Sequence, residues 1–206
     1  MSQVKPAPRK TRIQQRNEEL ILDAALEVFA AYGYRGSTVD QIAMKCGLSK
    51  PNLLYYFRRK EDIYTAALER TLGDWLEPLR TLDPAGDPIV ELATYVSAKL
   101  RMARERPEAS RLFANEILHG APMIGKFLAG PLKELVDDKT AVIRGWAEQG
   151  LIAPVDPHQL IFAIWAITQH YADFDVQVRA VLGGAPDWET VQASLLKLLI
   201  EGLRPR

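Results

Sequence analysis

Lys50, Pro51 and Asn52 are three consecutive residues whose side chains could read the edges of DNA bases. A lysine ammonium can donate to guanine acceptors, an asparagine amide can pair with adenine, and a proline ring can contact a thymine methyl group. The three follow a Gly-Leu-Ser sequence, in which Ser49 is a typical helix cap and Pro51 falls in the first helical turn. They are therefore expected at the exposed start of a helix, where a helix-turn-helix places its base contacts.

Four further residues near this helix could hold the phosphate backbone of DNA. Thr38 begins a short helix with Gln41 three residues later, a capping-box pattern, and the N–H groups of a helix start favour a phosphate. Tyr55 and Tyr56 are long enough to reach phosphates, and Lys60 adds a positive charge at the start of the next helix. Structural alternatives stay open, because Thr38 is also needed as a cap and one of the two tyrosines could face the core.

The pattern of apolar residues predicts a small helical domain that positions these side chains. Residues 17–32 carry apolar residues at helical spacing, and Gly33 supplies a stop. Two short helices joined by a turn are predicted within residues 38–57, so residues 17–60 are expected to form a three-helix helix-turn-helix domain. Residues 1–16 contain five basic residues, no acidic residue and two prolines, and are predicted to be a flexible basic arm. The arm either reaches the DNA backbone or minor groove, or is a solvated tail without a role.

The rest of the chain also has the apolar period of helices. The predicted helices cover residues 61–82, 88–106, 107–119, 122–149 (one helix or two, because of Gly130-Pro131), 156–181 and 186–203. No stretch alternates in the way that a strand requires. We therefore predict an all-α fold of about nine helices, with residues 61–206 forming a second domain.

Composition and charge limit the class of protein. The net charge is zero, but residues 1–70 hold 12 basic against 8 acidic residues, and residues 71–206 hold 14 against 18. This asymmetry suggests a basic DNA-binding part on an acidic remainder. The single cysteine, Cys46, cannot form an intrachain disulfide, and no His and Cys residues have metal-site spacing. Because neither a spanning segment nor a signal peptide is recognisable, a cytoplasmic protein is predicted.

The sequence has none of the common signatures of an active site. It contains no nucleophile elbow and no glycine-rich phosphate loop. His119, His158 and His170 have no Ser or Cys partner at the spacing of a catalytic motif. We therefore predict that the protein is not an enzyme and uses no metal and no cofactor.

The segment ALEVFAAYGYRGSTVDQIAMKCGLSKPNLLYYFRRKEDIY, residues 25–64, resembles the DNA-binding domain of the TetR family. The shared signals are the aromatic residue and Gly after the first helix, Gly-x-Thr-x-x-x-Ile-Ala, the Gly-Leu-Ser turn, and Tyr-Phe followed by Lys-Glu. The resemblance implies a homodimeric regulator, usually a repressor, with two recognition helices about 34–36 Å apart on a palindromic operator. It also implies a second domain that dimerises and binds a small molecule that moves the heads out of register. The family's usual DNA contacts correspond to Lys50, Pro51, Asn52, Tyr56 and Lys60.

The second domain, residues 61–206, resembles regulators of pyrimidine utilisation within the same family. The similar segments are GDWLEPL, RERPEASRLFANEILHGAP, IRGWAEQG, DPHQLIFAIWAITQHYADFDVQV and EGLRPR. This resemblance implies that uracil or a related pyrimidine is the effector. The candidate ligand-binding residues are Trp75, Phe113, Trp165, Gln169, His170 and Tyr171.

Trp165 and Gln169 are the leading ligand candidates, because both lie near one face of the predicted helix at 156–181. The Gln amide offers a C=O and an NH₂, which complement the N–H and C=O of a pyrimidinedione, and a Trp ring offers a flat apolar wall. The alternatives are that Trp165 belongs to the core and that Gln169 bonds a backbone carbonyl or a dimer partner. His170 and Tyr171 are open to three interpretations: pocket, dimer face or surface.

The last two predicted helices, 156–181 and 186–203, are the expected dimer interface. In the final helix the apolar residues Val191, Leu195, Leu196, Leu198, Leu199 and Leu203 cover more than one face. Such a helix must be buried on more than one side, by a second copy or within its own monomer. Two other functions remain open: a TetR-family regulator of a different metabolite, and a DNA-binding factor that needs no ligand.

Overall fold

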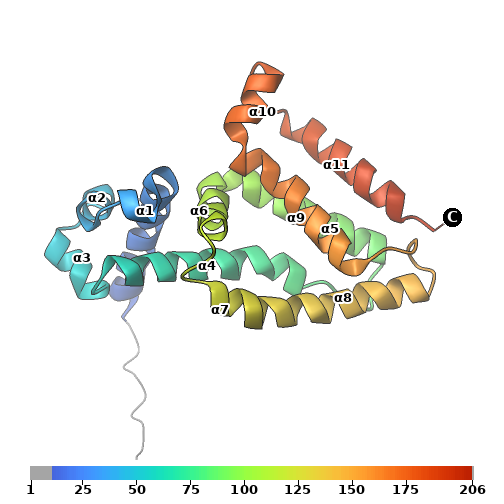
Figure 1. The fold of residues 1–206 in the computed structure, drawn as a ribbon, viewed down its shortest axis with the longest axis horizontal. Helices are drawn as coiled ribbons and strands as arrows, with labels where there is room; N and C mark the ends of the chain where they lie inside the picture. The colour runs from blue at the N-terminus through green and yellow to red at the C-terminus, as the bar shows by residue number, and fades with distance from the viewer. Residues whose placement is uncertain (1–10, 206) are drawn as a thin grey trace, which may run out of the picture. The chain divides into compact units, whose positions relative to one another are not determined.

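The computed structural model describes residues 11–205, which form helices and connecting turns with no strand among them (Figure 1). The elements are α1 (Arg12–Gly36), α2 (Val39–Lys45), α3 (Lys50–Tyr56), α4 (Lys60–Arg80), α5 (Pro88–Glu105), α6 (Pro107–Leu118), α7 (Gly125–Phe127), the π-helical η1 (Leu128–Leu132), α8 (Lys133–Glu148), α9 (Pro157–Asp173), α10 (Asp175–Leu182) and α11 (Trp188–Leu203). The all-α prediction is confirmed for this part of the chain. None of these helices is both long and apolar enough to cross a membrane.

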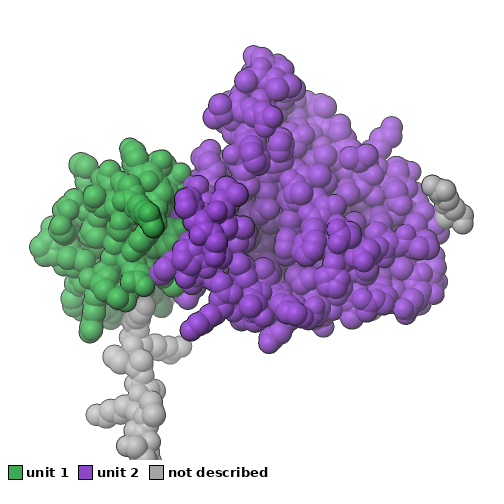
Figure 2. Space-filling view, in the orientation of Figure 1, with its two compact units in different colours: residues 1–67 green, residues 68–206 purple. Residues whose placement is uncertain are grey.

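The chain divides into two compact units, residues 1–67 and 68–206, and the division falls inside α4 (Figure 2). We call residues 11–67 the head and residues 68–205 the body. The head extends beyond the predicted boundary at residue 60 because the first turns of α4 carry buried side chains. Tyr64, for example, packs edge-on against Phe29 with ring centroids 4.9 Å apart.

Helix α1 begins earlier than predicted, so the predicted arm is too long. The first helical residue is Arg12, and Thr11 caps the helix together with Gln14 in a reciprocal capping box. Residues 12–16 therefore belong to α1, and residues 1–10 lie outside the described residues. The helix stop predicted at Gly33 is confirmed, because this residue has φ 68° and interrupts the helical geometry. A short helical segment follows Gly33 and ends at Gly36.

The body is built around α5, which packs against both α9 and α11, while α9 also contacts α6 and α8. In Figure 1, α5 and α9 run side by side and α10 projects beyond them. The buried side of α5 presents Leu92, Tyr95, Val96 and Leu100 to a continuous apolar core. This spacing of three and four residues is that of one helix face.

Two predicted helices have internal interruptions. The helix expected over 156–181 ends at Asp173, and Phe174 (φ −114°, ψ 30°) separates α9 from α10. The helix expected over 122–149 begins at Gly125 and passes through η1, which contains Gly130 and Pro131, before α8. Pro131 has no N–H to donate, which accounts for a local change of helical geometry there. These interruptions raise the count from about nine helices to eleven α-helical segments within residues 11–205.

Candidate DNA-binding and effector sites

The turn between α2 and α3 reverses the chain within four residues. Gly47 has φ 70°, which an L side chain rarely adopts, and the N–H of Leu48 donates to the Ala43 carbonyl at 2.9 Å. The Thr38–Gln41 capping box predicted for α2 is present: the Gln41 N–H donates to Thr38 Oγ1 at 3.2 Å. The helix-turn-helix geometry is therefore specified by residues within the segment itself.

Helix α3 exposes its first three residues and buries the fourth. Ser49 caps α3 by accepting from the Asn52 N–H. Lys50, Pro51 and Asn52 are exposed, whereas Leu53 is 0% exposed and anchors the helix to the head. The predicted base-reading side chains thus lie together on the outer surface of a short, well-anchored helix.

Lys50 forms an ion pair across the turn with an acidic residue of α2. Its Nζ atom lies 2.8 Å from Asp40 Oδ2, and both side chains remain about half exposed or more. Exposed pairs of this kind contribute little stability, so Lys50 can exchange Asp40 for a base at small cost. Asp40 is a neighbour that the sequence analysis did not assign.

The two adjacent tyrosines of α3 have different environments. Tyr55 is 71% exposed, whereas Tyr56 is half-buried and its hydroxyl accepts a hydrogen bond from Asn17 Nδ2 at 2.7 Å. Tyr56 therefore ties α3 to α1, and Tyr55 is the freer of the two to reach a phosphate.

Lys60 caps the end of α1. Its ammonium donates to the carbonyls of Tyr34 at 2.7 Å and Ser37 at 2.8 Å, and lies 4.4 Å from the centroid of the Tyr34 ring. An ammonium has three N–H donors, so one remains for a phosphate. Lys60 therefore has a structural role in the head in addition to the predicted phosphate contact.

In the body, two predicted ligand residues lie together at a polar cluster. The rings of Trp75 on α4 and Phe113 on α6 have centroids 6.0 Å apart. The ammonium of Lys99 on α5 lies 4.0 Å from the Trp75 centroid, a cation–π distance. On the α4–α5 side, Trp75 also lines a cavity of about 250 Å³.

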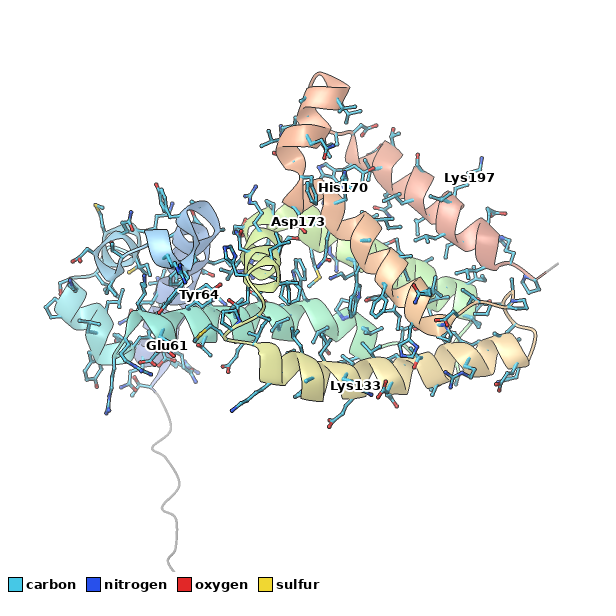
Figure 3. All side chains as sticks on the ribbon, in the orientation of Figure 1. Glu61, Tyr64, Lys133, His170, Asp173 and Lys197 are labelled. Carbon is cyan, nitrogen blue, oxygen red and sulfur yellow. The ribbon has the colours of Figure 1, made fainter. Side chains whose placement is uncertain are left out.

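The polar side of this cluster is formed by α5, α6 and α9. Ser110 Oγ on α6 donates to Asp173 Oδ1 at the end of α9, which Figure 3 labels beside α6. Burial lowers the pKa of Lys99 to about 7, and the attraction of Asp173 offsets only part of this effect. Burial also raises the pKa of Asp173 against the opposing effects of Ser110, Arg111, Lys99 and His170. We call Trp75, Lys99, Ser110, Phe113 and Asp173 the effector cluster.

Both units match sequence models of one family. Residues 21–67 match the model described as bacterial regulatory proteins, tetR family, and residues 68–206 match the model described as YcdC-like protein, C-terminal region. The chain belongs to the TetR family. It is a helix-turn-helix transcriptional regulator, in agreement with the resemblance that the sequence indicated.

Similarity to individual TetR-family members extends over the whole chain. The chain is 44% identical to the HTH-type transcriptional regulator RutR of Escherichia coli (strain K12) over 98% of each protein. A solved TetR family transcription regulator from Marinobacter aquaeolei has a TM-score of 0.73 at 20% identity, covering 95% of this chain and 100% of that one. AibR, solved with isovaleryl coenzyme A and operator DNA, has a TM-score of 0.69 at 20% identity, covering 89% and 98%. These two structures support the fold.

The other predicted ligand residues lie on α9, the helix that carries Asp173 at its end. Trp165 donates from Nε1 to the Tyr95 hydroxyl at 2.6 Å, so its polar atom is engaged with the core. His170 is exposed and stacks on Phe174 at 5.1 Å, and Tyr171 packs against Trp188. His170 and Tyr171 line a groove of about 660 Å³ formed by α9, α10 and α11. Gln169 is half-buried on α9. Of the six candidates, Trp75 and Phe113 are in ring contact, and His170 acts electrostatically on Asp173.

Sequence reasoning missed Lys99, Ser110 and Asp173. A usable signal was present, because Lys99 falls three and four residues after Val96 and Tyr95, on the apolar face of α5. A charged residue on a buried helix face is uncommon and needs a partner or a function. Within residues 11–205, no group of three or more His, Cys, Asp or Glu side chains is arranged to hold a metal ion.

Proposed function

We propose that this TetR-family regulator binds a palindromic operator as a homodimer, acts as a repressor, and is released by uracil or a related pyrimidine. The observation that carries the proposal is that the 44% identity to RutR extends through the body as well as the head. If the body bound an unrelated ligand, its sequence would be expected to be less similar to RutR than the sequence of the head is. RutR is a transcriptional regulator. We infer a pyrimidine effector because segments of the body resemble regulators of pyrimidine utilisation.

The head supplies the surface for DNA. Lys50, Pro51 and Asn52 share an exposed helix start that Leu53 anchors, and this is the part of a recognition helix that enters the major groove. Thr38, Tyr55 and Lys60 flank this surface and are the proposed phosphate contacts. Tyr56 is the fourth proposed contact, and its hydroxyl already accepts a hydrogen bond from Asn17 Nδ2. We assign base reading to Lys50 and Asn52, an apolar base contact to Pro51, and backbone contact to Thr38, Tyr55, Tyr56 and Lys60.

The effector cluster supplies the surface for a small planar ligand. Trp75 and Phe113 offer flat apolar walls, which suit a heterocyclic base. Trp75 also lines a cavity of about 250 Å³ with Thr71, Asp74 and Arg101, which has room for a single-ring molecule. The other four residues of the effector cluster are not among the lining residues of this cavity. A ligand that binds the body more tightly in a state with low DNA affinity lowers operator occupancy by mass action.

A second copy of the chain would cover apolar side chains left exposed on the last three helices. These are Phe162, Phe174, Val176, Val181, Leu182 and Leu198, on or adjoining α9, α10 and α11. Leu198 is 70% exposed although it lies mid-helix in α11. Exposed apolar patches commonly mark protein interfaces, and α9 with α11 of two copies would make a four-helix interface.

A binding assay on genomic DNA with and without uracil tests the proposal. We expect selective retention of a small number of fragments with palindromic sites, and their release when uracil is added. Uracil at about 100 times its dissociation constant should also stabilise the protein by about 2.7 kcal/mol. Thymine, nucleosides and amino acids form the comparison panel. Retention of all fragments with no stabilisation by any panel member would favour a ligand-independent DNA-binding factor, and stabilisation by a non-pyrimidine would favour a different effector.

A further inference from the structure

The ammonium of Lys99 is buried without a hydrogen-bond acceptor among the described residues. The residue is 4% exposed, and within residues 11–205 its Nζ atom has the Trp75 ring as its close neighbour but no oxygen in hydrogen-bonding range. No fully enclosed polar side-chain atom of the described residues lacks a partner. The Nζ atom is therefore not fully enclosed.

Such a lysine weakens the ligand-free fold. A buried charge is tolerated when it is paired and hydrogen-bonded, and Lys99 has only the ring and a more distant carboxylate. A second buried lysine of the body shows the usual solution, because Lys139 donates to the carbonyl of Leu82, two residues beyond α4, at 3.3 Å. Unlike Lys139, Lys99 has no acceptor among residues 11–205, which leaves its ammonium able to donate to a bound ligand.

Asp173 offers the complementary group on the same cluster. One carboxylate oxygen accepts from Ser110, which fixes the side chain and leaves the other oxygen able to accept a further donor. Lys99 and Asp173 attract each other, but no ion pair joins them within residues 11–205. A molecule that presents an acceptor next to a donor would be complementary to both groups.

We propose that Lys99 and Asp173 determine the specificity of the effector site by binding the C=O and the adjacent N–H of a planar cyclic imide beside Trp75. Lys99 Nζ donates to a ring carbonyl oxygen, and Asp173 accepts from the neighbouring ring N–H. The inference rests on the proposed function for the ligand class, a pyrimidinedione, and adds the residues that recognise it. It assigns to two charged side chains the polar contacts that Gln169 was predicted to supply.

Lys99→Met is the decisive variant, because it has opposite effects on fold and ligand. Replacing a poorly satisfied buried ammonium by an apolar side chain of similar length should raise the thermal midpoint of the ligand-free protein. The same change should weaken uracil binding about 10- to 100-fold, the range for losing a hydrogen bond to a charged group. Lys139→Met is the matched control, since it should lower the midpoint and leave uracil affinity unchanged.

The pH dependence provides an independent readout. The pKa of Lys99 is lowered from 10.5 to about 7 in the folded protein, so between these values the unfolded chain holds a proton that the folded chain lacks. Stability relative to Lys99→Met therefore rises with pH through this interval. Uracil affinity should instead fall above pH 7 as the donor loses its charge. The other charged groups around the pair are Arg111 on α6 and His170 on α9, while α4 contributes the Trp75 ring.

Isothermal titration of full-length wild type, Lys99→Met and Lys139→Met with uracil, and with 1,3-dimethyluracil, tests the inference. We expect wild type and Lys139→Met to bind uracil equally, Lys99→Met to bind it at least about tenfold more weakly, and none to bind the dimethyl derivative, which lacks the N–H for Asp173. Equal uracil affinity of wild type and Lys99→Met would overturn this inference and leave the proposed function standing. A wild type that binds no uracil would overturn both.

Discussion

The head and the body each place a lysine ammonium against an aromatic ring, but only the head gives it oxygen partners. Lys60 donates to two backbone carbonyls at 2.7 and 2.8 Å, whereas Lys99 has the ring of Trp75 and no acceptor within the described chain. Lys60 therefore stabilises the end of α1, whereas burial of the Lys99 ammonium without an acceptor is unfavourable for the fold. This difference underlies our proposal that the acceptor for Lys99 is part of a bound ligand, whereas the acceptors for Lys60 belong to the head itself.

Among the substitutions in the head, Lys60→Ala should have the largest effect on stability. The variant loses two charge-assisted hydrogen bonds, and we expect the head to be destabilised by about 1.5–3 kcal/mol. If the remaining N–H also contacts a phosphate, the salt dependence of DNA binding falls by about one unit of slope. Thermal unfolding and binding titrations at several salt concentrations measure the two effects separately. Unchanged stability would contradict the capping role, and an unchanged slope would remove the phosphate contact.

Asn52→Ala should affect sequence preference and leave the fold of the head intact. Its side chain is exposed, so stability should change little, while discrimination at one base pair should fall by about 1–3 kcal/mol. Competition between the operator and single-base variants measures the preference. If each single-base change in the operator lowers the affinity of Asn52→Ala by the same factor as it lowers that of the wild type, Asn52 does not read a base.

Thr38→Ala tests whether the head is specified by local caps. Loss of the hydroxyl that accepts from the Gln41 N–H should cost about 1 kcal/mol, and Thr38→Ser should restore most of it. Chemical denaturation of the three proteins provides the comparison. An Ala variant as stable as the wild type would mean that α2 is held by packing alone.

Asp40→Asn should have the smallest effect on stability. The pair with Lys50 is exposed, so its loss should change the free energy of unfolding by less than about 1 kcal/mol. DNA affinity should increase slightly, because a negative charge beside the base-reading lysine is removed. Weaker DNA binding by Asp40→Asn would show instead that the pair orients Lys50 for its contact.

The sequence was a better guide to the head than to the body, for a physical reason. The caps at Thr38 and Ser49 and the turn at Gly47 act within four residues, so their spacing is visible in the sequence. The start of α1 was missed because the predicted arm was defined by charge, whereas Thr11 and Gln14 form a cap.

The effector cluster joins α4, α5, α6 and α9, and no local pattern reports which residues meet. Trp75 and Phe113 were predicted and do lie together. Lys99, Ser110 and Asp173 come from three different helices, and even the bonded pair Ser110 and Asp173 are 63 residues apart in the sequence. Helical periodicity places Trp165 and Gln169 near one face of α9. It does not show that the Tyr95 hydroxyl accepts a hydrogen bond from the indole N–H of Trp165.

The most direct test of release by uracil is to measure the affinity of uracil for the free protein and for the operator-bound protein. If uracil releases DNA because it favours a state with low DNA affinity, it must bind the operator complex more weakly, by the same factor by which it weakens DNA binding. We predict this reciprocal loss in wild type and Lys139→Met, and its absence in Lys99→Met. Equal uracil affinity of free and operator-bound wild type would contradict the account.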